Sequence, residues 1–274
     1  MVEAGAMEAH RIEVGEGTLY VAEHGVGKAV LLGHSLLADG SMFSHQVAEL
    51  SQDHRVLNVD LRGHGRSFVP DSAYDVEDLA GDYGRVLDAL GVERAVIVGL
   101  SLGAMAAMQY ALDEPKRVAG LVLMDTKADG DELWRRFRRR VLGVLVLCLG
   151  PRLVFFRRAA PILFGSTFRR VHRSRVEAWL ERMTRLRPEA VYRAIDMLSR
   201  RRPVHERLHE LDVPTLVVVG EEDEGTPLTC ARVIADGIAG ARLEVIASAG
   251  HLSTIEQPEA TTRAIRRFLC EHDL

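Results

Sequence analysis

Short aliphatic runs alternate with longer segments of helical periodicity over the first 125 residues of the chain. The aliphatic runs have the length and the near-continuous apolar character of strands that are buried on both faces. These predicted strands are Ala29–Leu32, Arg55–Val59, Ala95–Val98 and Gly120–Met124. The helical segments between them are Met42–Leu50, Val76–Leu90 and Ala104–Leu112. This order predicts a parallel sheet that is covered by helices and connected by right-handed crossovers.

A hairpin and a second group of alternating segments complete the pattern. The predicted hairpin pairs Arg11–Val14 with Leu19–Glu23 across a glycine-containing turn. The second group comprises the strands Thr215–Val219 and Leu243–Ile246, the helix Leu228–Ile238 and a last helix from Glu259. The predicted fold class is therefore α/β, with a mostly parallel central sheet.

The segment between residues 126 and 203 is helical in pattern and interrupts the sheet. Prolines or glycines break it near residues 150, 161, 188 and 203. We therefore predict a core made of residues 1–125 and 204–274, with residues 126–203 inserted as a helical cap. A chain of 274 residues is long enough to bury one sizeable core of this kind.

Charge distinguishes the inserted segment from the rest of the chain. Residues 131–203 contain 19 Arg, no Lys and 6 Asp or Glu, a net charge of +13, whereas the remainder carries −17. The total of −4 and the pI near 6.3 argue against general nucleic-acid binding. The three cysteines are an odd number, which argues against a disulfide framework, and they show no metal-binding spacing. Because the amino terminus has no basic region followed by an apolar run, we expect a cytoplasmic location.

The motif GLSLG (residues 99–103) lies where a predicted strand gives way to a predicted helix. A serine on such a turn needs a strained backbone to project its hydroxyl, and flanking glycines give the turn steric room. The start of the helix then presents N–H groups and a positive dipole end toward developing negative charge. We therefore predict that Ser101 is a catalytic nucleophile.

The carboxy-terminal segments supply a base and an acid for Ser101. His251 follows the predicted strand that ends near residue 246, and Asp223 follows the strand that ends near residue 219. Serine, aspartate and histidine in this chain order are typical of hydrolases whose nucleophile lies on such a turn. All three residues lie beyond the carboxyl ends of parallel strands, where open α/β sheets place their sites. Asp125, directly after Gly120–Met124, is the alternative acid.

Backbone N–H groups are expected to hold the oxyanion that forms when Ser101 attacks a carbonyl. One is that of Leu102, which follows the nucleophile, and the other is that of Leu36 in the loop GHSLLADG. His34 in this loop either braces it or is an ordinary loop residue. This chemistry requires no metal ion and no organic cofactor.

The densest basic stretch, WRRFRRRVLGVLVLCLGPRLVFF (residues 134–156), leads directly into an apolar run. The run from Val141 to Pro151 has 11 residues, whereas a membrane-spanning helix needs about 20. We predict a cap helix whose apolar face looks down over Ser101 and lines the substrate pocket. The residues predicted on this face are Trp134, Phe137, Val141, Val144 and Leu145. The neighbouring arginines are expected to be solvated, with peripheral contact to an anionic membrane or to an acidic partner as the alternatives.

With these residues identified, the chain resembles the α/β-hydrolase superfamily over nearly its whole length. The motifs that carry the resemblance are GHSLL (33–37), DLRGHGRS (60–67), GLSLG (99–103), LVLMDT (121–126), GEEDEGTP (220–227) and AGHLSTIEQPE (249–259). The sequences of these motifs are most similar to those of enol-lactone hydrolases and related small-molecule esterases. The resemblance implies a triad of Ser101, Asp223 and His251, with Leu36 and Leu102 as the oxyanion residues.

These predictions describe a serine hydrolase that cleaves a carboxylic ester or lactone through an acyl-enzyme, with an apolar acyl pocket under the cap. Hydrolysis of a carbon–carbon bond and perhydrolysis use the same triad and stay open as alternatives. Two more alternatives are an interfacial lipid hydrolase that contacts anionic membrane and a non-catalytic binding protein on the same fold. The expected partner is a small-molecule ester or lactone, and the sequence carries no signal of oligomeric state.

Overall fold

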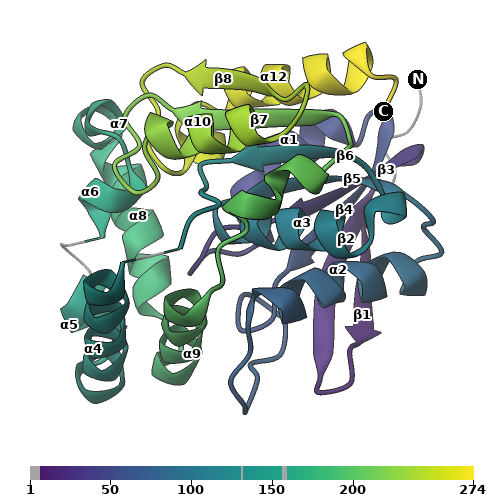
Figure 1. Ribbon diagram of the computed structural model, residues 1–274. Coiled ribbons are helices and arrows are strands. Elements are labelled where there is room, and N and C mark those ends of the chain that lie inside the picture. The colour runs from purple at the N-terminus through teal and green to yellow at the C-terminus, as the bar shows by residue number, and fades with distance from the viewer. Residues whose placement is uncertain (1–6, 131, 156–158) are drawn as a thin grey trace.

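One sheet of eight strands runs through the described part of the chain (Figure 1). The structure is a computed structural model that describes residues 7–130, 132–155 and 159–274. Its strands are β1 (Glu8–Glu13), β2 (Thr18–His24), β3 (Lys28–Gly33), β4 (His54–Asp60), β5 (Ala95–Leu100), β6 (Val118–Met124), β7 (Thr215–Gly220) and β8 (Arg242–Ile246). They lie in the order β1-β2-β4-β3-β5-β6-β7-β8, and only the β1–β2 and β2–β4 pairs of these strands are antiparallel. The predicted α/β fold with a mostly parallel sheet is confirmed.

Helices cover both faces of this sheet (Figure 1). They are α1 (Ser44–Leu50), α2 (Val76–Ala89), α3 (Leu102–Asp113), α10 (Leu228–Gly237), α11 (Ser253–Glu256) and α12 (Pro258–Glu271), with the 3₁₀ helices η1 (Gly40–Phe43), η2 (Pro115–Arg117) and η3 (His205–Glu210). Side chains of β5 alternate between the faces: Ala95 and Ile97 pack with α2 and α3, whereas Val96 and Val98 pack with α1 and α12. Because both faces are buried, the strand is apolar throughout.

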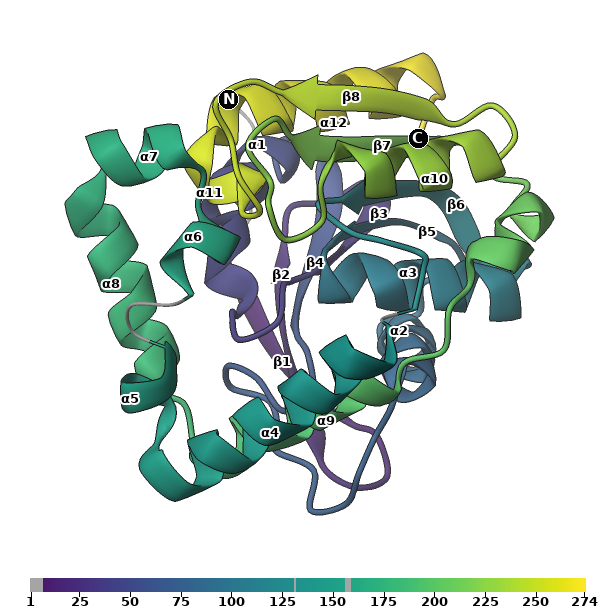
Figure 2. The same ribbon diagram turned by 60° about the vertical axis from the view of Figure 1, so that its left-hand side comes forward.

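Between β6 and β7 the chain leaves the sheet and forms a group of helices beside it, which we call the cap (Figures 1 and 2). These helices are α4 (Leu133–Leu149), α5 (Pro151–Phe155), α6 (Ala160–Leu163), α7 (Ser166–Val171), α8 (Arg173–Thr184) and α9 (Pro188–Arg200). Val146 of α4 meets Val191 and Ile195 of α9 in a small core of their own. Phe168 of α7 and Leu180 of α8 join the buried cluster on the α12 side of the sheet. The helical character of the inserted segment agrees with its sequence, while the domain boundaries at residues 125 and 203 stay a prediction.

The orientation of α4 differs from the prediction. The five side chains expected to line the pocket lie on the outer surface of the cap, with exposed fractions of 41% to 69%: Trp134, Phe137, Val141, Val144 and Leu145. The buried side of α4 instead contains Gly143 and Val146. A Cβ at Gly143 would lie 3.1 Å from the Tyr192 ring, so this side is the one that lets α9 approach closely. Helical periodicity predicts that a helix has an apolar face, but not which layer that face meets.

Candidate active site

Ser101 occupies the sharp turn from β5 into α3. Its φ of 53° and ψ of −104° form a backbone conformation that non-glycine residues rarely adopt. Two hydrogen bonds hold this strained turn: the Ser101 N–H donates to the Met124 carbonyl at 2.8 Å, and the Thr126 hydroxyl donates to the Ser101 carbonyl at 2.9 Å. Gly103 is required here because a Cβ would overlap the Gly33 carbonyl of β3. The turn therefore presents Ser101 to the cavity at the carboxyl edge of the sheet.

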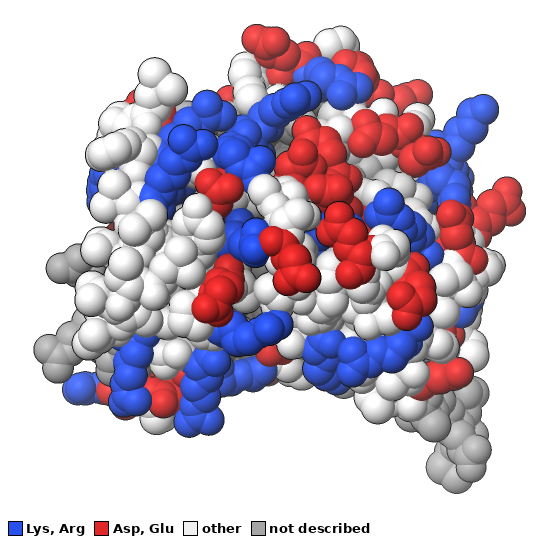
Figure 3. Space-filling view, turned by 90° about the horizontal axis from the view of Figure 1, so that it is seen from below, with Lys and Arg blue, Asp and Glu red and all other residues white. Residues whose placement is uncertain are grey.

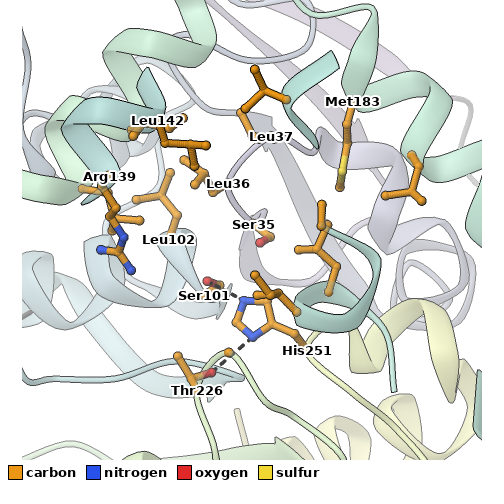
Figure 4. Close-up of a pocket in the computed structure, with 18 of the residues that line it drawn as sticks. Ser35, Leu36, Leu37, Ser101, Leu102, Arg139, Leu142, Met183, Thr226 and His251 are labelled. Carbon is orange, nitrogen blue, oxygen red and sulfur yellow. Dashed lines mark hydrogen bonds between the residues drawn. The ribbon is translucent and has the colours of Figure 1, made fainter. Parts of the chain in front are cut away.

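Two hydrogen bonds connect Ser101 to His251 and Asp223. His251 Nε2 lies 2.9 Å from Ser101 Oγ (Figure 4). On the other side of the ring, His251 Nδ1 lies 2.9 Å from Asp223 Oδ2. With Nδ1 protonated, His251 donates to Asp223 and accepts from the Ser101 hydroxyl. All three side chains are buried. The structure thus brings together three residues that are far apart in the sequence and follow β5, β7 and β8.

Thr226 holds Asp223 in place, and Figure 4 shows the Thr226 side chain beside the His251 ring. Its hydroxyl donates to Asp223 Oδ2 at 2.7 Å. The N–H groups of Gly225 and Thr226 donate to Asp223 Oδ1 at 2.7 and 3.0 Å. A carboxylate that accepts several hydrogen bonds is stabilised in its charged form. The sequence contained only a weak signal for this role, a threonine three residues after the acid in a predicted loop.

The acid and the base stabilise each other's charges. Burial acts to raise the pKa of Asp223, but the positive charge of His251 and hydrogen bonds from His251 and Thr226 outweigh it and keep that pKa below its usual value. Burial acts to lower the pKa of His251, but the charge of Asp223 outweighs it and holds that pKa above its ordinary 6.5. Asp223 is therefore ionised when His251 takes up a proton.

Asp125, the alternative acid, is completely buried between the loops of the triad. Its Oδ1 accepts the Gly220 N–H at 2.8 Å, and its Oδ2 lies 2.5 Å from the Ser253 hydroxyl oxygen. It thus connects the strand before Asp223 to the loop after His251. Burial and the nearby negative charge of Asp223 raise the pKa of Asp125 to about 8. At neutral pH, Asp125 is accordingly protonated, and Asp223 is the carboxylate that His251 contacts.

His34 connects the loop after β3 to the loop after β4. Its Nε2 accepts the Leu61 N–H at 2.9 Å, and its Nδ1 donates to the Ser35 carbonyl at 2.8 Å. The ring is completely buried, and burial lowers its pKa, so it stays neutral. Of the two interpretations of His34, this geometry supports the brace.

A cavity of about 380 Å³ opens at Ser101. The predicted oxyanion residues Leu36 and Leu102 line it close to Ser101 (Figure 4), and the role of their N–H groups stays a prediction. The cap supplies mostly aliphatic and methionine side chains to the lining, among them Leu142, Val154, Ile162, Leu163, Leu180 and Met183. Lys127, Arg138 and Arg139 add positive charge, so α4 contributes a mixed surface where the sequence predicted an apolar one. Within the described ranges, no group of three His, Cys, Asp or Glu side chains could hold a metal ion.

Two further carboxylates attach the cap to the loops of the triad. Glu222 accepts the Thr167 N–H at 2.8 Å, next to Asp223 in the chain. Glu256 Oε2 accepts the Gly165 N–H at 2.8 Å and the Gly250 N–H at 2.9 Å. The sequence carries no signal for these cap contacts, because Glu222 and Thr167 lie 55 positions apart and Glu256 and Gly165 lie 91 positions apart.

Comparison with known proteins identifies the family. A profile of the alpha/beta hydrolase family matches residues 21–264, which is most of the chain. The chain belongs to the alpha/beta hydrolase family. Among solved structures, this α/β-hydrolase is similar to a thermophilic esterase from Thermogutta terrifontis, with 31% sequence identity and a TM-score of 0.90. The match covers 98% of this chain and 99% of the esterase.

Other relatives of this α/β-hydrolase carry different names. "Putative carbamate hydrolase RutD" from Variovorax paradoxus is 33% identical over 247 residues, covering 89% of this chain and 92% of the relative. The structure of the enol-lactonase from Burkholderia xenovorans is 26% identical with a TM-score of 0.86, covering 95% of this chain and 100% of that one. The predicted family, fold and hydrolytic enzyme class are confirmed by these relatives.

The protonated state of Asp125 predicts a pH dependence of stability for this α/β-hydrolase. Its pKa is about 8 in the folded protein against an ordinary 3.8, so between these values only the folded state retains the proton. Its contribution to the free energy of unfolding is complete below about pH 4 and is lost as the pH rises through about 8. Asp125→Asn should remove this loss. As the pH rises from about 5 to 9, the melting temperature of the variant should therefore fall by several degrees less than that of the parent protein.

Asp71→Asn, at an exposed position, is the matched control and should follow the parent protein at every pH. Melting temperatures from circular dichroism provide the measurement. A melting curve of Asp125→Asn that falls as steeply with pH as the parent's would contradict a protonated Asp125.

Proposed function

We propose that this α/β-hydrolase cleaves a carboxylic ester or lactone through an acyl-enzyme intermediate on Ser101. The observation that carries the proposal is the pair of 2.9 Å contacts that join Ser101 Oγ to His251 and His251 to Asp223. A serine becomes a nucleophile when a neighbouring base can accept its proton, and the base needs an oriented acid. The contacts meet both requirements beside a cavity large enough for a small acyl group.

In the proposed reaction, His251 Nε2 accepts the hydroxyl proton as Ser101 Oγ attacks the carbonyl carbon of the substrate. The carbonyl oxygen becomes an oxyanion next to the N–H groups of Leu36 and Leu102. His251 then returns the proton to the leaving alcohol oxygen, and the acyl group stays on Ser101. In the second half, His251 takes a proton from a water molecule as the water oxygen attacks the acyl carbon. The acyl–Oγ bond then breaks, the free acid leaves, and His251 returns the proton to Ser101 Oγ. Asp223 stays ionised throughout and stabilises the imidazolium.

The cavity supports an acyl group that is largely apolar. Aliphatic side chains from the cap line the cavity at Ser101. Burial of a hydrocarbon acyl chain against such side chains stabilises the bound substrate. The names of relatives support three related carbonyl substrates, namely esters, lactones and carbamates. Perhydrolysis and carbon–carbon bond hydrolysis use the same triad and are distinguished by product analysis. A panel of esters with increasing acyl length, a lactone and a carbamate would rank the substrate classes.

Replacement of the nucleophile tests the proposal. Ser101→Ala should lower kcat for p-nitrophenyl butyrate by at least about 10⁴-fold, because the proposed acyl-enzyme forms on the Ser101 hydroxyl. Ser41→Ala, at an exposed serine outside the cavity, is the control and should keep the parent's activity. Both variants should retain the parent's circular dichroism spectrum. Turnover by folded Ser101→Ala within about tenfold of the parent would show that Ser101 is not the nucleophile.

The electrostatics of His251 predict the acid limb of the pH profile. The base must be neutral to accept the serine proton, and the pKa of His251 lies above its ordinary 6.5. The value of kcat/KM for a non-ionising ester should therefore rise with pH, reach half its maximum above pH 6.5 and then level off. A limb centred at about pH 4 would indicate that a carboxylate acts as the base instead.

A further inference from the structure

Exposed apolar side chains gather on one helix of the cap. Of the 15 large apolar side chains that are exposed in the described residues, 11 lie in the cap and 8 lie on α4. Six of them form a continuous face at helical spacing, which we call the outer stripe: Leu133, Trp134, Phe137, Val141, Val144 and Leu145. Soluble monomers rarely expose an apolar face of this length, and such faces mark contact surfaces.

The outer stripe is not part of the packing of the cap. The opposite side of α4 faces α9 through Gly143 and Val146, and Leu142 on that inner side lines the catalytic cavity. The stripe runs from Leu133 to Leu145, about 20 Å along the axis of α4, and could lie along a flat surface over this length. None of the helices that the structure describes is long and apolar enough to cross a membrane. The stripe is therefore suited to lying on a surface and not to spanning a bilayer.

Arginines border the outer stripe on both of its long edges. At 3.6 residues per turn, Arg138 follows one edge and Arg140 the other. The guanidinium groups of Arg135 and Arg138 lie 5.4 and 5.0 Å from the centre of the Trp134 ring, within cation–π range. Arg140 is 60% exposed, and its nearest carboxylate, that of Asp196, is 3.8 Å away. On the face in Figure 3, an uncharged area on the side of the cap lies between groups of basic side chains, whereas acidic side chains crowd the middle and the right.

We propose that the outer stripe of α4 docks the protein flat on an anionic lipid surface. Apolar side chains on one face of a helix insert between headgroups, while arginines at its edges reach the phosphate groups, and the two contributions add. A second copy of the chain would fit this surface less well, because it would bring two rows of arginines together in a cap of net charge +13. The complementary surface therefore combines hydrocarbon with negative charge.

Docking through the outer stripe would also bring the cavity close to the lipid. The inner side of α4 lines the cavity, so only the thickness of one helix, about 10 Å, would separate the two. Ile162 lines the cavity and is 54% exposed, which gives its rim an apolar edge in the cap. The docking proposal does not depend on the reaction that occurs at Ser101.

Sedimentation with vesicles tests the docking surface. We expect the full chain to bind phosphatidylcholine vesicles that contain phosphatidylglycerol at least about tenfold more tightly than pure phosphatidylcholine vesicles, and to lose much of this preference at about 1 M salt. Phe137→Ser with Val144→Ser should reduce binding at least about tenfold, because both side chains lie in the outer stripe. Thermal unfolding should stay close to that of the parent, since both positions are exposed.

The matched control is Val26→Ser with Val245→Ser, two exposed apolar residues outside the cap, which should leave vesicle binding unchanged. Equal binding to both kinds of vesicle, or an equal loss in the control, would overturn the proposal. Light scattering supplies a second outcome against it: a parent dimer that Phe137→Ser with Val144→Ser converts to monomer, together with no vesicle binding, would assign the stripe to a second copy.

Discussion

Four neighbouring strands end at the same edge of the sheet, and this constraint determines where the chemistry lies. The strands β5, β6, β7 and β8 are parallel and adjacent, so the residues that follow them meet although up to 150 positions separate them in the chain. Ser101, Asp125, Asp223 and His251 each follow one of these strands. The cap covers this edge, and in the proposed reaction it would limit the access of bulk water to the charges that form there. A helix or loop inserted elsewhere would not have this effect.

Two buried carboxylates lie at this edge, and their surroundings give them different roles. Asp223 accepts hydrogen bonds from Gly225, Thr226 and His251, which stabilise its charge. Asp125 is more deeply buried and lies close to that charge, so it retains a proton near neutral pH. Two negative charges so close together would destabilise the folded protein, and protonation of one of them avoids this cost.

The sequence was sufficient to predict the strands, the Ser101 turn and the position of His251, because each depends on a local pattern or on chain order. It favoured Asp223 as the acid and kept Asp125 as the alternative, since both follow a predicted strand. The different roles of these two residues depend on partners such as Thr226, which no local pattern identifies. The sequence also did not predict which side of α4 faces inward. The reason is that α9 contacts the side that contains Gly143 and leaves the larger apolar side exposed. Carboxylates such as Glu222 and Glu256 act across long sequence distances, where no spacing identifies them.

A covalent acyl group on Ser101 would be the most direct sign that the strained turn, the histidine and the aspartate act together in this α/β-hydrolase. Rapid acid quench after mixing with p-nitrophenyl butyrate, followed by peptide mass spectrometry, would detect it. We expect a butyryl group on the peptide that contains Ser101, formed in a burst and lost as free acid appears. Hydrolysis that continues with unmodified Ser101 at every quench time, or with the acyl group on another residue, would contradict it.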